Sequence, residues 1–136
     1  MMSVERQMWV PGRIILEVSA GLIIAGGLYD VFTPRLPSNL AQICGANEGA
    51  QKLTRELLRA LGGSLIAIGV ACAYLVTVSG AQPDGSTILL ILLLVVPAEF
   101  INAICMFRAG SPFYFPMAFG LLTILGAALW WAQPLG

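Results

Sequence analysis

Histidine is absent from this chain of 136 residues, and charged residues make up only 10% of it. The lack of histidine removes the commonest metal ligand, a usual haem ligand and the default general base of enzymes. Any chemistry must therefore use carboxylates, hydroxyls, amides or thiols. We expect no metal site and no other cofactor.

The few charges also balance: the chain has seven Lys and Arg residues and seven Asp and Glu residues, so its formal net charge is zero. Without a basic excess, a nucleic-acid partner is not expected. Apolar residues are abundant instead: 58% of the chain is hydrophobic and the mean hydropathy is +0.87. An ordinary soluble domain is about 25% charged, so this composition predicts an integral membrane protein whose first partner is the lipid bilayer.

Paired cysteines are lacking as well. The three cysteines, Cys44, Cys72 and Cys105, form no CxxC motif, and free cysteine in an apolar segment behaves as a small hydrophobic residue. We interpret all three as structural. A disulfide between two of them, or a redox dithiol linked to a quinone, is the alternative and would need the fold to bring two together.

Four apolar segments cover most of the chain, at about residues 12–32, 57–79, 87–107 and 113–131. Each is close to the ~20 residues that cross a bilayer core as a helix. Arg6 and Arg13 near the first segment would also suit a signal peptide, but no clear small-x-small cleavage site follows. The sequence predicts a single all-α domain over residues 1–136, an integral membrane four-helix bundle.

The connections between the segments differ in length. Residues 81–86 (AQPDGS) and 109–112 (AGSP) are short and built from turn-forming residues. The first connection, residues 33–56, has two early prolines and then good helix formers with mixed charge from Asn47 to Arg59. We expect a long loop at the membrane surface that contains a short helix.

Basic residues near the segment ends predict the orientation. The side of the first and third connections carries Arg35, Lys52, Arg55, Arg59 and Arg108, whereas the side of the termini carries Arg6 and Arg13. Cytoplasmic loops of membrane proteins are enriched in Lys and Arg. Both termini are therefore expected on the non-cytoplasmic side.

Small residues recur at four-residue spacing in the first two apolar segments, as in Gly21 with Ala25 and Gly63 with Ala67. Such spacing lets helix backbones approach closely in a membrane. We expect the first two helices to pack tightly on each other, and small-residue faces to allow association into a homo-oligomer.

Glu99 lies inside the third apolar segment, in VVPAEFINAICMFR, residues 95–108. At 1.5 Å per residue it is roughly 14 to 18 Å from either end of the segment, close to the bilayer midplane. A charge there costs about 2.5 to 3.5 kcal/mol even on the gentler insertion scales. We expect Glu99 to face the bundle interior as a neutral carboxylic acid while the site is empty.

Two neighbours give Glu99 a polar setting. Asn102 shares its helix face, and Pro97 frees the carbonyl of residue 93. One interpretation is structural, with Glu99 and Asn102 hydrogen-bonded to side chains of neighbouring helices, namely Ser19, Ser64, Thr123 or Tyr74. The other interpretation is functional, with both side chains lining a cavity. Because acidic residues inside membrane segments usually serve a function, we favour this second interpretation.

Two further acids have local explanations. Glu17 follows Arg13 by four residues, so an ion pair between them is one interpretation; the other turns Glu17 inward, to the far end of a cavity that Glu99 lines. Asp30 ends the first segment near several arginines. We expect a structural ion pair between Asp30 and Arg59.

Two families offer resemblances. GLIIAGGLYDVFTP (21–34), ICG (43–45) and RALGGSLIAIGVACAYL (59–75), followed by two further apolar segments, resemble the small four-helix bacterial membrane proteins of the DoxX-like kind. That resemblance implies a four-helix fold and, for some members, a role as a subunit of a membrane oxidoreductase. GRIILEVSAG (12–21), with Glu17, is similar to the first helix of small multidrug transporters, from which the long first connection and Glu99 depart.

By chemistry, acids in an apolar bundle suit isomerases and cyclases that act on sterols, terpenes or epoxides. An apolar setting keeps a carboxyl group protonated, so it can protonate an alkene or epoxide, while a second carboxylate or amide removes a proton or steadies the cation. We assign the catalytic roles to Glu99, Asn102 and Glu17, and the substrate contacts to Tyr74, Ser64 and Met106.

The sequence thus predicts a membrane protein that handles a hydrophobic small molecule in an acidic pocket, as a cofactor-free isomerase or cyclase. A proton-coupled transporter and a non-catalytic subunit of a membrane complex are the alternatives.

Overall fold

The computed structural model describes residues 10–80 and 83–133, and within them the fold is all-helical. The helices are α2 (Pro11–Phe32), α3 (Ser38–Cys44), α4 (Glu48–Val78), α5 (Gly85–Arg108) and α6 (Tyr114–Trp131). All but α3 are long and apolar enough to cross a membrane. The prediction of an all-α fold with four such helices is confirmed. Arg6 lies outside the described residues.

Helix α4 begins at Glu48 instead of near residue 57. The side chain of Asn47 accepts a hydrogen bond from the backbone N–H of Ala50 at 3.0 Å, which caps the helix there. Glu48 adds a negative charge in the first turn, where the helix dipole favours it. The helix formers of the first connection therefore belong to α4, and the rest of that connection holds α3.

Helices α2 and α4 pack with their backbones in contact. A Cβ atom added to Gly62 would lie 2.6 Å from the carbonyl oxygen of Gly27, and one added to Gly27 would lie 2.5 Å from the carbonyl oxygen of Gly62. The expected close packing of the first two long helices is present, but through Gly27 and Gly62. Gly21 and Gly63 face open space.

The bundle is tightly packed at the end where α2 begins and α6 ends. Leu16, Ile91 and Trp130 are fully buried there, and Gly126 leaves room for α6 to lie against Leu16 of α2. Farther along, the hydroxyl groups of Ser19 and Thr123 share a hydrogen bond of 2.8 Å between α2 and α6. This end holds most of the apolar core.

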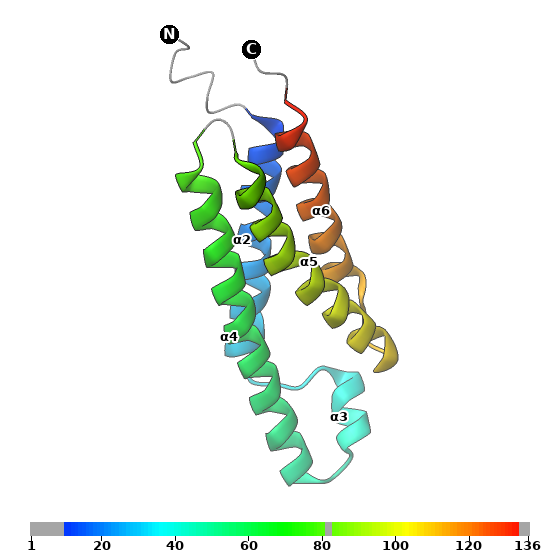
Figure 1. The fold of residues 1–136 in the computed structure, drawn as a ribbon. Coiled ribbons are helices and arrows are strands. Elements are labelled where there is room, and N and C mark those ends of the chain that lie inside the picture. The colour runs from blue at the N-terminus through cyan, green and yellow to red at the C-terminus, as the bar shows by residue number, and fades with distance from the viewer. Residues whose placement is uncertain (1–9, 81–82, 134–136) are drawn as a thin grey trace.

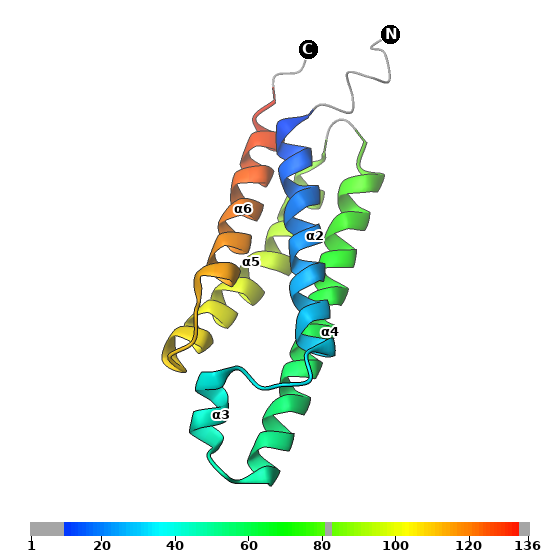
Figure 2. The same cartoon turned by 180° about the vertical axis from the view of Figure 1, so that it is seen from behind.

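The opposite end is looser. Helices α4 and α5 leave their short connection together and then diverge, while α2 packs against both α4 and α6 (Figure 1). Figure 2, from behind, shows α3 beside the first turns of α4 and below the turn that joins α5 to α6. The side chain of Asn39 in α3 donates a hydrogen bond to Ser111, in the turn between α5 and α6. The first connection therefore reaches across to the α5–α6 pair.

Candidate functional site

A cavity of about 440 Å³ lies in this looser part of the bundle. Its wall comes from all four long helices and from Pro37, just before α3. Small-molecule sites in proteins commonly measure about 300 to 1,000 Å³, so the cavity is large enough for one ligand.

Glu99 of α5 lines this cavity and is almost completely buried, with 1% of its surface exposed. Gly120 of α6 lets the two helices meet beside it, because a Cβ at Gly120 would lie 2.8 Å from the ring of Phe100, the residue after Glu99. Within the described residues, Oε1 of Glu99 is buried and has no hydrogen-bond partner. Buried polar atoms are nearly always hydrogen-bonded. A bound molecule is therefore a candidate partner for this oxygen.

The structural interpretation of Glu99 is not supported by the hydrogen bonds present. The hydroxyls of Ser19 and Thr123 bond to each other and to the carbonyl oxygen of Phe119. Ser64 is exposed and donates to Ala60 of its own helix, and Tyr74 is 66% exposed. Of the expected substrate contacts, Ser64 and Tyr74 therefore face outward on α4, whereas Leu65 lines the cavity.

Asn102 and Met106 lie on the same face of α5 as Glu99, and both line the cavity. Their spacing of three and four residues follows the helix repeat. The structure thus brings together three of the residues assigned from the sequence: Glu99, Asn102 and Met106.

Glu17 is not part of this cavity wall. It is exposed on α2, where one carboxylate oxygen lies 3.0 Å from Nε of Arg13. The local ion pair, one of the two interpretations of Glu17, is the arrangement found. The structure therefore does not bring Glu17 together with Glu99.

Asp30 takes the place that we expected for Glu17, because its partly buried side chain lines the cavity from the end of α2. The expected ion pair with Arg59 is not formed: Nη1 of Arg59 lies 2.8 Å from a carboxylate oxygen of Glu56, three residues earlier on α4. That neighbour satisfies Arg59 locally, and no ion pair joins Asp30 to another described residue.

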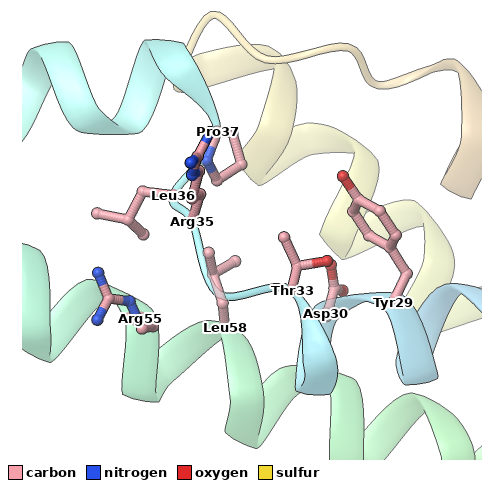
Figure 3. Close-up of a pocket in the computed structure, with 8 residues that line it drawn as sticks. All are labelled: Tyr29, Asp30, Thr33, Arg35, Leu36, Pro37, Arg55 and Leu58. Carbon is pink, nitrogen blue, oxygen red and sulfur yellow. The ribbon is translucent and has the colours of Figure 1, made fainter.

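A second, small pocket of about 20 Å³ adjoins Asp30 on the side of the first connection. Figure 3 shows Tyr29 and Asp30 of α2, and Thr33 just after it, near the segment that carries Pro37, with Arg55 coming from α4. Nε of Arg55 is buried without a hydrogen-bond partner in the described part of the chain. The pocket has room for about one water molecule, which could join these groups.

Aromatic side chains complete the main cavity, and sequence reasoning missed them. Phe115 and Phe119 of α6 and Tyr29 of α2 line it, as do Ile23 and Gly26. The spacing of Ile23, Gly26 and Asp30, three and then four residues, is a helix-face signal that could have placed Asp30 in the cavity. Because the whole segment is apolar, that signal does not stand out.

Neither a candidate metal site nor a disulfide is found in the described residues. No three His, Cys, Asp or Glu side chains gather there. The three cysteines are free, with Cys72 buried and Cys105 exposed, so the alternative of a disulfide is not realised in this structure. The groups that can act on a ligand are the Glu99 and Asp30 carboxyls, the Asn102 amide and the Tyr29 hydroxyl.

Comparison with models of known protein families, with curated proteins and with solved structures gives no match for this chain. The resemblance to DoxX-like proteins therefore stays a prediction.

Proposed function

We propose that this chain is a multi-pass membrane protein that binds a hydrophobic small molecule in the cavity between α2, α4, α5 and α6, and that Glu99 acts on it as a carboxylic acid. Glu99 would donate a proton to the bound molecule. Asn102, Asp30 and the hydroxyl of Tyr29 are the other polar side chains that line the same cavity, and they would steady the charge that results. This is the chemistry of an acid/base isomerase or cyclase.

The outer surface supports a membrane location. Large apolar side chains are exposed on every long helix, among them Leu22, Val70, Leu93 and Leu125, each at least 40% exposed. A helix that is apolar on all sides is either buried in a large protein or lies in a membrane. Lipid contact gives these side chains an apolar environment without a further protein partner.

The observation that carries the proposal is the buried, unpartnered Oε1 of Glu99 at the cavity wall. Leaving such a group unbonded costs about 1 to 3 kcal/mol. A ligand that offers or accepts a hydrogen bond there recovers this energy, and the apolar wall accommodates the rest of the molecule.

Native mass spectrometry of the full chain, released from its membrane in mild detergent, tests the proposal. The wild type should carry a bound small molecule, and Glu99→Gln should carry less because the amide cannot donate a carboxyl proton. Gly26→Leu should carry none: a Cβ at Gly26 meets only Phe119, at 3.8 Å, so the larger side chain would extend into the cavity.

Two matched variants serve as controls. Glu17→Gln removes an exposed acid that is paired with Arg13, and Gly21→Leu adds the same bulk to α2 where nothing lies within 4 Å. Both should retain the ligand. If all five proteins carried the same molecules in the same amounts, ligand binding in this cavity would be wrong.

The fate of the released molecule separates catalysis from transport. After incubation with sealed vesicles that contain the protein, an isomerase or cyclase yields an altered compound that Glu99→Gln does not form. A transporter yields the same compound on the other side of the membrane, and that result would remove the enzymatic half of the proposal.

A further inference from the structure

The charge inventory of the cavity wall points to one class of ligand. Two of the lining residues, Glu99 and Asp30, carry carboxyl groups, and no lysine or arginine lines the cavity within the described residues. Two arginines, Arg35 and Arg55, line the neighbouring small pocket, which Asp30 also lines. An anionic ligand would meet carboxyl groups without a counter-charge in the main cavity, whereas a cation would meet its counter-ion.

The two carboxyl groups differ in their surroundings. Asp30 is partly exposed and lines both pockets. Water can therefore hydrogen-bond to its carboxyl group, and the arginines of the small pocket can compensate its charge. Glu99 is buried and its Oε1 lacks any hydrogen-bond partner among the described residues. A hydrogen-bond donor on the ligand is therefore needed at Glu99 more than at Asp30.

The aromatic rings favour the same ligand. Phe115, Phe119 and Tyr29 line the cavity together with Glu99, and the face of an aromatic ring attracts an ammonium group electrostatically. Asn102, one helical turn from Glu99, adds an amide oxygen that can accept a hydrogen bond. The remaining wall, with Ile23, Leu65 and Met106, suits hydrocarbon.

We propose, building on the function proposed above, that the ligand of this cavity is a hydrophobic amine held as its ammonium ion, with the nitrogen at Glu99 and the hydrocarbon portion among the aromatic and aliphatic side chains. The proton balance is simple. A neutral amine that enters from the bilayer takes the proton of the Glu99 carboxylic acid, and the N–H of the ammonium then donates to the carboxylate.

Equilibrium binding to the full chain in lipid nanodiscs tests this, with empty nanodiscs to subtract partition into lipid. The first probe is radiolabelled N,N-dimethyl-3-phenylpropylamine. The second is its labelled neutral analogue, a tertiary alcohol in which C–OH replaces the nitrogen and the carbon skeleton is kept. We expect saturable binding of the amine at one molecule per chain and binding of the alcohol weaker by at least about tenfold, the loss typical of a charge-assisted hydrogen bond.

Glu99→Gln should weaken amine binding by at least about tenfold and bring it near that of the alcohol, since only the carboxylate offers a counter-charge. Glu17→Gln should bind the amine as the wild type does. Gly26→Leu keeps Glu99 but fills the cavity, so it should bind neither probe; this variant places the binding in the cavity even if Glu99→Gln folds poorly.

The outcomes separate the two proposals. Alcohol binding as tight as amine binding, lost in Gly26→Leu, would overturn the amine and leave the hydrophobic-ligand cavity standing. No saturable binding of either probe would count against the cavity function itself as well as against the amine. Amine binding that survives in Gly26→Leu would place the amine elsewhere and overturn the inference.

Discussion

At the residue scale, Glu99 combines burial with a missing partner, and a stability measurement can detect this. Replacing Glu99 with Met keeps the volume and removes the unsatisfied oxygen. Exchanging a buried unsatisfied polar group for a well-packed apolar one is commonly neutral or stabilising, by up to a few kcal/mol. We expect Glu99→Met to raise the thermal unfolding midpoint of the ligand-free protein while it abolishes ligand binding.

Ile101→Met is the matched control for this substitution, because Ile101 lies on the same helix and is 61% exposed. It should leave both the unfolding midpoint and ligand binding close to those of the wild type. A Glu99→Met protein that unfolds at a lower temperature than the wild type would mean that Glu99 has a structural partner after all.

Asp84, which caps the start of α5, gives a prediction about pH. Hydrogen bonds from Ser86 and Thr87 lower the pKa of Asp84 from 3.8 to about 2. Because the folded-state pKa lies below the unfolded one, the cap stabilises the protein above the unfolded pKa and stops doing so as pH falls through the folded pKa. Near neutral pH, Asp84→Ala should therefore speed hydrogen exchange at the Thr87 amide.

That difference in exchange should disappear as the pH falls from about 4 to about 2. Asp84→Asn retains an oxygen that can accept from Thr87 but does not titrate, so its protection should not change over the same range. Equal pH dependence in all three proteins would show that Asp84 does not control the start of α5.

At the scale of helices, the sequence predicted the four apolar segments, because hydropathy is a strong signal. It also predicted the burial of Glu99, because an isolated acid in an apolar segment avoids lipid. The sequence did not predict which face of α4 turns toward the bundle interior. Leu65 and Gly69 face the bundle while Ser64 and Tyr74 face out. In a helix that is apolar all round, composition does not mark the inner face; contact with α2 decides it.

The glycine contact between α2 and α4 can be tested with two adjacent positions. Gly62→Ala should destabilise the protein by about 1 to 3 kcal/mol, because the new Cβ would lie 2.6 Å from the Gly27 carbonyl oxygen. Gly63→Ala meets nothing within 4 Å, so it should be neutral or stabilise the helix by up to about 1 kcal/mol. Thermal unfolding in one detergent compares them, and equal effects would contradict the packing described.

At the scale of the whole molecule, the membrane location and the orientation within it are both still predictions, and added cysteines test them. In a chain with Cys44→Ser and Cys105→Ser, Ser38→Cys places a thiol in the first connection and Asp84→Cys places one at the opposite end of the bundle. A maleimide that does not cross membranes should label the Asp84 position on intact cells, and the Ser38 position only after permeabilisation. The reverse pattern would place the termini in the cytoplasm.

In the membrane location proposed above, the unequal lengths of α4 and α6 predict how the protein responds to bilayer thickness. Helix α4 has 31 residues and α6 has 18, or about 46 Å and about 27 Å at the standard rise. A bilayer that matches α6 leaves the first turns of α4, with Lys52 and Arg55, among the headgroups, and a thicker one draws them inward at a cost in hydrophobic mismatch. Asn39 ties α3 to Ser111, and Pro37, just before α3, lines the cavity. Tilting of α4 would strain this link, so under the proposed function we expect ligand access to change with acyl-chain length.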